Sequence, residues 1–562
     1  MLDHFTNKPR VAYLSMEIAF HEDLPTYSGG LGVLAGDSML SAADLDLPMV
    51  GVTLVSREGY FRQHLDDGGG QTESPETWEP SQYATRLPAK TSIQLQGETV
   101  WICAWLYELR GHMNGCIPIV LLDTFVEENS AENRTLTHHL YGGDTQYRLK
   151  QEALLGIGGE RMLRALGFTI FRYHMNEGHS ALLVFELLRH YRFASENGQE
   201  ADYLSDLPRV RDLCCFTTHT PVDAGHDRFD YAMVEDVLGE EINLNVVKKL
   251  AGEACLNMTQ LALNGSQYIN GVAKKHADVS RDMFPGYRIH AITNGVHPHR
   301  WVSPPLAALL DAYLPGWCHE PELLRNVDII PSDELWQAHQ LAKQSLIAHI
   351  HATQNTSLNV ALPILGFARR MTSYKRADLL FSNIDTLIHI AERYPFQIVL
   401  GGKAHPQDHD GKHLIQQLHI TAKALKDVIP VVFLENYDIP QARQLIGGSD
   451  IWLNTPLRPY EASGTSGMKA AINGVANLSV MDGWWIEGCV EGQTGWAIGG
   501  VSPSENGNDA QSLYQKLENE VLPMYYERQE EWVQLMKFCI QKNGTYFNSH
   551  RMMRRYVSEA YL

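Results

Sequence analysis

The sequence lacks any excess of positive charge. It has 46 Lys and Arg against 66 Asp and Glu, which gives a net charge of −20 at pH 7. A nucleic acid or an anionic membrane surface as the main partner would require an excess of Lys and Arg. The sequence also has no run of roughly 18 apolar residues that could span a bilayer, and its first residues form no basic and then apolar signal region. We therefore expect a protein that binds neither nucleic acid nor membrane.

Cysteine pairs and metal-ligand spacings are also missing. The eight cysteines include no C-x-x-C pair, which argues against a disulfide framework and against a structural zinc site. His219, His226, His297 and His299 lack a recognised ligand spacing, so no metal site is predicted. Free thiols are typical of a reducing compartment, and a cytoplasmic location is expected.

The chain is otherwise ordinary in composition and long. Hydrophobic residues make up 44% of its 562 residues and charged residues 20%, and this length exceeds what one hydrophobic core supports. Short apolar runs alternate with helical stretches, which predicts parallel sheets with βαβ crossovers. The predicted strands are 10–17, 48–55, 117–122, 214–218, 288–293, 362–368, 397–400, 431–434, 451–454 and 476–480. The clearest helical stretches are 144–166, 180–191 and 332–353.

A break at residues 294–298, where Gly and Pro interrupt the pattern, indicates a domain boundary. We therefore predict an α/β protein with two doubly wound, Rossmann-like domains that face a central cleft. The first domain is predicted at 1–300 and the second at 301–530. A C-terminal helical segment, 531–562, is expected to pack back on the first domain. Because the first strand begins at Arg10, we expect no N-terminal regulatory arm.

The segment EASGTSGMK at residues 461–469 combines small residues, hydroxyl groups and a lysine. Its glycines let the backbone turn closely around an anion, and it opens a helix whose free N–H groups favour a phosphate. A lysine just inside that helix could bind an aldehyde covalently once its ammonium loses a proton. By spacing alone, a capped Ser/Gly-rich loop with a solvated lysine is the simpler alternative.

A basic segment and a second glycine-rich loop add to this pattern. Four cations lie between Arg369 and Arg376, directly after a predicted strand. Arginine suits bidentate capture of phosphate oxygens and lysine gives a compact point charge, although a solvated basic loop is the plain alternative. The segment YSGGLGVLA at 27–35 is a turn before a helix, and its amides could approach a phosphate or a sugar.

These motifs resemble those of the glycogen and starch phosphorylases, and they occur in that family's order from Arg10 to about Gly500. Residues 461–469 are similar to the family's EASGTGNMK, residues 369–376 to KRxxxYKR, and residues 27–35 to GGLGRLA. Shorter matches are YLSME at 13–17, LKQE at 149–152, TNGVHP at 293–298 and FLENY at 433–437. The resemblance implies the GT-B glycosyltransferase architecture.

The resemblance also implies pyridoxal 5′-phosphate as a cofactor on Lys469. It assigns the other cofactor-binding positions to Arg369, Thr465, Ser466, Gly467 and Tyr437. Three of these positions depart from the family: Ser466 and Gly467 replace Gly and Asn, and Arg369 replaces a lysine. Asp438 replaces an arginine beside the cofactor phosphate, and the sequence does not identify a compensating group.

The implied reaction is reversible phosphorolysis of an α-1,4-glucan to glucose 1-phosphate, with retention at the anomeric carbon. Arg370 and Lys375 are the implied binders of the substrate phosphate, and the backbone carbonyl of His219 would face the anomeric centre. The remaining implied substrate contacts are Gly29, Gly30, Leu31, Asn294, Glu461, Ala462, Ser463 and Gly464. The cofactor phosphate would act in proton transfer, and no carboxylate nucleophile is expected.

Two alternatives remain open. A nucleotide-sugar glucosyltransferase of the glycogen-synthase type would use Arg370 and Lys375 to hold a diphosphate and would leave Lys469 without a cofactor. An inactive glucan-binding protein would keep only the fold. Trp484 and Trp485 are a further candidate for stacking on a sugar, with a buried core pair as the alternative. The sequence leaves open the preferred glucan, effectors, and whether the chain forms a homo-oligomer.

Overall fold

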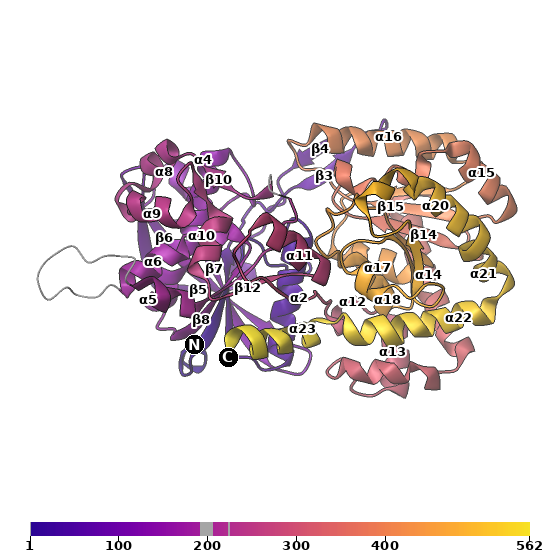
Figure 1. Ribbon diagram of the computed structural model, residues 1–562, viewed down its shortest axis with the longest axis horizontal. Coiled ribbons are helices and arrows are strands. Elements are labelled where there is room, and N and C mark those ends of the chain that lie inside the picture. Colours follow the sequence, from indigo (N-terminus) through magenta and orange to yellow (C-terminus); the bar gives the residue numbers. More distant parts are fainter. Residues whose placement is uncertain (1, 192–205, 223–224) are drawn as a thin grey trace, which may run out of the picture.

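The computed structural model describes residues 2–191, 206–222 and 225–562. Figure 1 shows two α/β halves side by side, the first from the indigo and magenta part of the chain and the second mostly from the orange and yellow part. Among the described residues, no helix is both long and apolar enough to cross a membrane.

The first half is built on a nine-stranded sheet of order β13-β12-β9-β8-β1-β2-β7-β6-β5. Its strands are β1 (Arg10–Leu14), β2 (Met49–Leu54), β5 (Thr85–Leu95), β6 (Glu98–Arg110), β7 (Cys116–Asp123), β8 (Ile170–Asn176), β9 (Cys214–Thr217), β12 (Tyr268–Gly271) and β13 (His290–Ala291). Neighbours from β13 to β7 pair in parallel, and β6 pairs antiparallel with β7 and β5. Because β1 pairs with both β2 and β8, the direction of winding reverses there, and a ligand crevice is expected at the carboxyl ends of β1 and β8.

The second half contains a six-stranded, fully parallel sheet of order β16-β15-β14-β17-β18-β19. Its strands are β14 (Ile364–Ala368), β15 (Gln397–Gly401), β16 (Val431–Leu434), β17 (Ile451–Asn454), β18 (Ala476–Val480) and β19 (Gly495–Ile498). Numbered within this half, the order is 3-2-1-4-5-6, which is typical of doubly wound sheets. The winding reverses between β14 and β17, so a ligand crevice is expected between the segments that follow these two strands.

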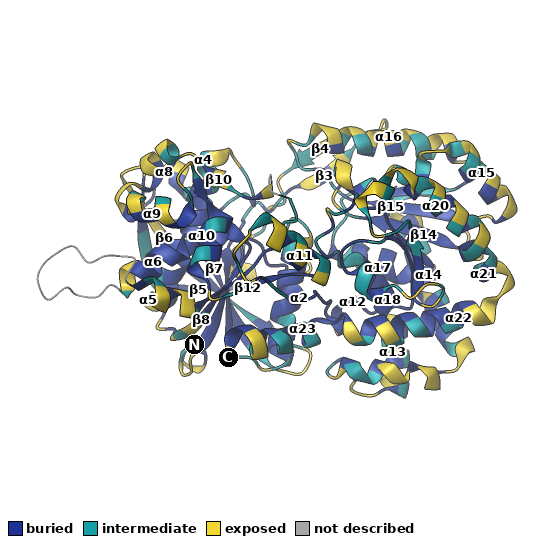
Figure 2. Cartoon of the chain, viewed as in Figure 1, coloured by how far each residue is buried: buried dark blue, intermediate teal, exposed yellow. Residues whose placement is uncertain are grey.

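The prediction of an α/β fold with parallel sheets is confirmed, because each predicted strand overlaps an observed one. The predicted helices correspond to α4 (Thr145–Ala153) with α5 (Gly159–Ala165), to α6 (Leu183–His190) and to α14 (Ser332–Gln354). Within the two large sheets, strands β5, β6, β8, β12 and β19 were not predicted. Figure 2 shows both sheets in the buried colour and the exposed residues on outer helices such as α15 (Ile384–Arg393) and α16 (His409–Leu425).

The C-terminal segment contributes to both halves. Trp532 and Phe547 belong to the core of the second half. The last helix, α23 (Ser549–Tyr556), packs on the first sheet, where Met552 and Tyr561 join a core that also contains residues of β1. In Figure 1 this yellow helix lies beside the first half, close to the N-terminus.

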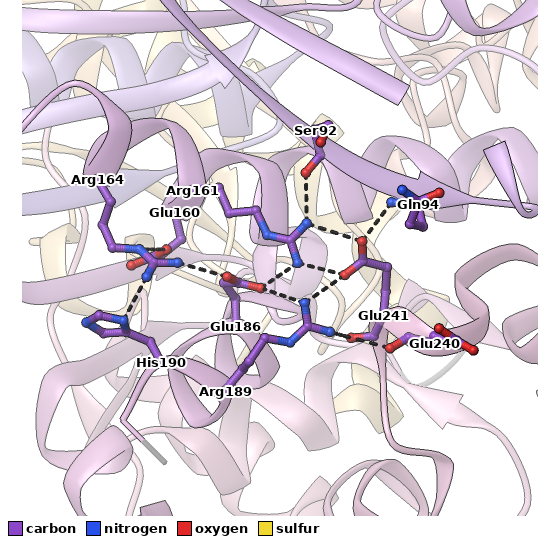
Figure 3. A network of polar contacts seen from close by, with 10 residues as sticks. All are labelled: Ser92, Gln94, Glu160, Arg161, Arg164, Glu186, Arg189, His190, Glu240 and Glu241. Carbon is purple, nitrogen blue, oxygen red and sulfur yellow. Dashed lines mark hydrogen bonds and ion pairs between the residues drawn. The ribbon is translucent and has the colours of Figure 1, made fainter. Parts of the chain in front are cut away.

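An ion-pair network fastens the helices α5 and α6 to the first sheet (Figure 3). Arg161 pairs with Glu186 at 2.9 Å and with Glu241 at 2.6 Å. Arg164 pairs with Glu186 at 2.9 Å, and Arg189 pairs with Glu241 at 3.0 Å. Both glutamate side chains are nearly inaccessible to water, so removing an arginine would leave a buried carboxylate without its partner.

Candidate active site

The candidate site lies at the winding reversal of the second sheet. Arg369 and Arg370 follow β14 directly, and Lys375 ends a short 3₁₀ turn, η8 (Ser373–Lys375). The segment 461–465 lies between β17 and the helix α18 (Ser466–Ile472).

Glu461 is the anionic centre of this region. Its Oε2 accepts hydrogen bonds from Arg369 Nη2 at 2.7 Å and from Lys375 Nζ at 2.9 Å. Burial alone would raise the pKa of Glu461, but the charges of Arg369 and Lys375 outweigh it and lower the pKa to about 2. Glu461 is therefore ionised, and it holds two of the predicted phosphate-binding cations together. The Nε of Arg369 is buried with no partner in the described part of the chain, so it still offers a donor.

Lys469 lies in α18, and its amine forms no ion pair with a carboxylate of the described residues. Its Nζ lies 3.8 Å from the centre of the Trp301 ring, and within the described ranges no acidic oxygen is at ion-pair distance from it. Burial, assisted by the nearby Arg300 charge and opposed by Asp37, lowers the pKa of Lys469 to about 8. A minor but substantial fraction of this amine is therefore neutral and nucleophilic near physiological pH, far more than for a solvated lysine.

The segment before α18 is close-packed. Gly464 has a φ of 74°, a left-handed conformation that favours glycine. A Cβ on Gly467 would lie 2.5 Å from Asn477 Oδ1 and 2.8 Å from Trp484 Cζ2, so a larger residue fits only if these side chains shift. The Ser463 Oγ is buried and has no partner among the described residues. An orphaned hydroxyl beside a tight glycine turn suits a bound anion.

The two tryptophans do not line a sugar site. Trp484 and Trp485 are 1% and 0% exposed, and the Trp484 ring packs edge-on against Phe547 at 4.8 Å. The hypothesis that this pair stacks on a sugar is wrong, because the segment turns both rings into the core. Trp484 instead occupies the space beside Gly467.

The four cations of the basic segment separate into two groups. Arg370 is exposed and its Nη2 donates to the Tyr60 hydroxyl, in the first half, at 3.4 Å. Arg376 turns away and pairs with Asp509 at 2.5 Å, beside the bidentate pair that Arg458 makes with the same carboxylate. Arg376 is therefore structural, and it anchors the turn that carries Lys375.

The glycine-rich loop of the first half is held by an acid that follows β1. Glu17 Oε2 accepts the N–H groups of Ser28 at 2.6 Å and Gly29 at 3.2 Å. Gly29 caps the helix α2 (Gly30–Asp44), and the first N–H groups of that helix, including those of Gly30 and Leu31, have no acceptor within it. These groups are placed to receive a ligand oxygen.

His219 follows β9 and is oriented by the end of β8. Its N–H donates to Glu177 Oε2 at 2.7 Å, and its Nε2 lies 2.6 Å from Asn176 Oδ1. Burial, with the neighbouring histidines, lowers the pKa of His219 to about 3, so its ring is neutral. Glu177 has a φ of 70°, which is strained for a residue with a side chain, and burial raises its pKa to about 7.

Asn294 and Tyr437 complete the predicted set. Asn294 is buried, and its Oδ1 has no partner among the described residues. Tyr437 is half-buried. Its ring packs closely on Gly401, since a Cβ on that glycine would lie 2.9 Å from the ring. Asp438 accepts the Gln441 N–H at 2.9 Å and thereby caps the helix α17 (Ile439–Gly448).

Lys403 is a cation that the sequence analysis did not single out. Its Nζ donates to the Phe61 carbonyl at 3.1 Å. Burial raises the pKa of Asp438, and Lys403 is the first of the cations that oppose this rise. Lys403 is thus one of the cations whose charge acts on the acid at position 438, with His349 and Arg62.

One cluster in the described ranges has the geometry of a metal site. Ligand atoms of Asp44, His297 and His550 all lie within 4.8 Å of one another. However, the Arg300 N–H donates to His297 Nδ1 at 3.1 Å, so His297 carries its proton on Nε2, which lies 2.8 Å from Asp44 Oδ2. A protonated nitrogen is not a metal ligand, and the cluster is a hydrogen-bonded joint between α2 and α23.

Comparison with known proteins identifies the family to which the sequence motifs point. The family model described as carbohydrate phosphorylase matches residues 240–500. A maltodextrin phosphorylase of Thermococcus litoralis is 39% identical, over 99% of this chain and 71% of the relative. Glycogen phosphorylases of Mycobacterium tuberculosis and Aquifex aeolicus are 36% and 34% identical, over 98% and 99% of this chain and 70% and 86% of the relatives.

The chain belongs to the carbohydrate phosphorylase family. Four residues around the candidate site were not predicted from the sequence: Trp301, Glu17, Tyr60 and Lys403. Glu17 lies inside the quoted YLSME match and Trp301 follows TNGVHP by three residues, so both were adjacent to a recognised phosphorylase motif. Tyr60 and Lys403 gain their roles only where the two halves meet.

Proposed function

We propose that this carbohydrate phosphorylase is an α-1,4-glucan phosphorylase that carries pyridoxal 5′-phosphate on Lys469. The observation that supports it most strongly is the buried amine of Lys469, which has no carboxylate partner and lies in the helix that follows the segment of Glu461. A solvated surface lysine would be neither buried nor lowered in pKa. We further propose the GT-B arrangement, in which the carboxyl ends of both sheets border the site.

The residues present fit the cofactor. Lys469 offers an amine that loses its proton more readily than a solvated lysine, and Ser463 Oγ and Arg369 Nε are buried polar atoms without a protein partner in the described chain. Arg369, Thr465, Ser466, Gly467 and Tyr437 would hold the cofactor. When bound, pyridoxal phosphate supplies a phosphate group that exchanges a proton with the substrate phosphate.

The remaining roles belong to side chains and backbone of this chain. Arg370 and Lys375 bind inorganic phosphate or the phosphate of glucose 1-phosphate. The backbone of His219 stabilises positive charge at the anomeric carbon. Residues that would orient the terminal glucose are Gly29, Gly30, Leu31, Asn294, Glu461, Ala462, Ser463 and Gly464.

The named relatives act on maltodextrin and glycogen, so we propose an α-1,4-glucan of this type as the substrate. All eight cysteines are free, which agrees with a cytoplasmic location. The nucleotide-sugar transferase and the inactive glucan-binding protein are not favoured, because neither requires a desolvated lysine at position 469.

Borohydride reduction followed by peptide mass mapping tests the cofactor site. We expect a pyridoxyl phosphate adduct on Lys469, and none on Lys537, which is equally buried but donates to the Ile330 carbonyl at 2.6 Å. A Lys469→Arg variant should show no adduct. Unmodified Lys469 in protein supplied with the cofactor would overturn the proposal, and glucose transfer from a nucleotide sugar would then be tested.

A further inference from the structure

The hairpin β3–β4 of the first half reaches across to the second half. Its strands, β3 (Arg62–Leu65) and β4 (Gln71–Ser74), pair antiparallel in a two-stranded sheet of their own. In Figure 1 they lie next to α16, among the elements of the second half. Two of their side chains, Gln63 and Gln71, are 1% and 7% exposed. Buried side-chain amides are normally hydrogen-bonded, so these two are expected to have partners on the second half.

Gln63 binds two segments of the second half. Its backbone N–H donates to Asn436 Oδ1 at 3.0 Å, and its Oε1 accepts the Asn436 N–H at 2.9 Å. Its Nε2 donates to the Gly402 carbonyl at 3.0 Å and to Gln71 Oε1 at 2.8 Å. The residue thus fixes the segment after β15 relative to the segment after β16.

Gln71 completes the network. Its Oε1 also accepts the Ala404 N–H at 3.1 Å. Its Nε2 donates to the Ala404 carbonyl at 2.9 Å and to Glu73 Oε1 at 2.7 Å. Every polar atom of the two side-chain amides therefore has a partner, and a buried network in this state holds its members in one geometry. We call Gln63 and Gln71 the glutamine clamp.

The backbone that the clamp holds lies directly against the phosphate-binding segment. Arg369 donates its N–H to the Gly401 carbonyl at 3.2 Å, and Met371 donates its N–H to the Lys403 carbonyl at 3.0 Å. A Cβ on Gly402 would lie 2.0 Å from the Arg369 carbonyl oxygen. Residues 401–404 and the segment after β14 are thus in close contact. A displacement of either segment would therefore displace the other.

The residues before the hairpin reach the same segment from the other side. The Tyr60 hydroxyl accepts a hydrogen bond from Arg370, and the Phe61 carbonyl accepts one from Lys403. Residues 60–71 of the first half therefore contact the phosphate-binding cations directly through Tyr60 and indirectly through the clamp.

We propose that Gln63 and Gln71 are positioning residues for the phosphate site. They hold the backbone of 401–404 and of Asn436, and that backbone fixes Arg369 and Arg370 in place to bind phosphate. The inference rests on the proposed function for the identity of the ligand. Charge-assisted hydrogen bonds depend steeply on geometry, so loosening the support lowers phosphate affinity before it affects contacts to the glucan.

The test replaces each glutamine by methionine, which has a similar size and makes no comparable hydrogen bond. Thr72→Ala is the matched control, because Thr72 lies on the same hairpin and is exposed. Calorimetry measures the Kd of inorganic phosphate on cofactor-loaded protein, and kinetics measure KM for phosphate and for maltodextrin. We expect both phosphate constants to rise about tenfold in Gln63→Met and Gln71→Met, with KM for maltodextrin within about twofold of the parent. Unchanged phosphate constants, or an equal rise in both KM values, would overturn the inference.

A second variant covers a failure of the methionine proteins to fold. Asn436→Gly keeps the left-handed backbone of Asn436 (φ 53°) and its N–H, and it removes only the acceptor for the Gln63 N–H. A rise of about threefold in the phosphate Kd is expected, and no rise contradicts the clamp. If the parent protein binds phosphate but catalyses no phosphorolysis, the proposed function is wrong. The comparison of phosphate Kd between parent and variants still tests the clamp in that case.

Discussion

The amine of Lys469 lies 3.8 Å from the centre of the Trp301 ring. Trp301 in turn donates its indole N–H to Asp37, in α2 of the first half, at 2.7 Å. The lysine of the second half is thus buried by an aromatic residue that the first half holds in place. This shared burial is the cause of the lowered pKa of Lys469, and it makes the proposed cofactor site dependent on both halves.

The lowered pKa of Lys469 predicts a pH dependence of stability. The pKa is about 8 in the folded chain against an ordinary value of 10.5, so between these values the unfolded state binds more protons. The free energy of unfolding of the cofactor-free protein therefore rises with pH across this window, by about 3 kcal/mol from this group. Urea unfolding of Lys469→Met should lack the gain. Parallel pH profiles of parent and variant would contradict the buried, unpaired state of Lys469.

Removing the charge of Glu461 should make the protein depend on an added anion. Glu461→Gln leaves Arg369 and Lys375 buried without their carboxylate, and we expect a loss of about 3 kcal/mol in stability. Phosphate should restore stability to the variant more than to the parent, because an anion then replaces the carboxylate. Thermal unfolding with and without phosphate measures this, with Glu435→Gln, an exposed acid, as the control. An equal phosphate effect in both proteins would refute this account of the cluster.

The same carboxylate predicts acid sensitivity. The pKa of Glu461 is about 2 in the folded state against an ordinary 4.5. Its contribution to stability is therefore complete above pH 4.5 and is lost as the pH falls toward 2. The Glu461→Gln protein should show a correspondingly shallower loss of stability in acid.

Glu177 should govern the pH dependence of activity near neutrality. Its carboxylate accepts hydrogen bonds from the His219 N–H at 2.7 Å and the Thr220 hydroxyl at 3.0 Å, and it does so fully only when ionised. Because burial raises the pKa of Glu177 to about 7, kcat should increase as the pH rises through that value. Glu177→Gln should lose this limb and retain roughly a tenth of the activity at high pH. A variant with the parent's pH profile would assign the limb to another group.

The packing of Trp484 against Gly467 predicts an energetic coupling. Gly467→Asn introduces the family's usual residue 2.8 Å from the Trp484 ring, and overpacking of this kind costs about 1–3 kcal/mol. In a Trp484→Ala background the cost should fall by at least about 1 kcal/mol. A double-mutant cycle by denaturant unfolding measures the coupling, and additive effects would show that the two positions are independent.

Much of the fold followed from local pattern, whereas parts of the site did not. Strands β14 to β18 are short apolar runs between helices, and this pattern identifies buried parallel strands. Strand β8 carries Arg172 and His174, and β19 begins with a glycine, Gly495, so neither stands out as a run of strand-forming apolar residues.

The resemblance located Lys469, Arg369, Lys375 and Glu461, and the structure brings the last three into direct contact. It gave no indication of Trp301 as the partner of Lys469 or of Lys403 as a cation whose charge acts on Asp438. Those relationships join segments more than thirty residues apart and depend on the packing of whole elements. The burial of Trp484 also depends on tertiary structure, because an aromatic pair has the same local pattern in a core and in a sugar site.

The most direct test is the phosphate-dependent release of glucose 1-phosphate from maltodextrin by cofactor-loaded protein, with the anomer identified by NMR. The account predicts α-glucose 1-phosphate from the parent protein, none from Lys469→Met, and no glucose transfer from a nucleotide sugar by either. Transfer from a nucleotide sugar, or phosphorolysis that survives the loss of Lys469, would contradict it.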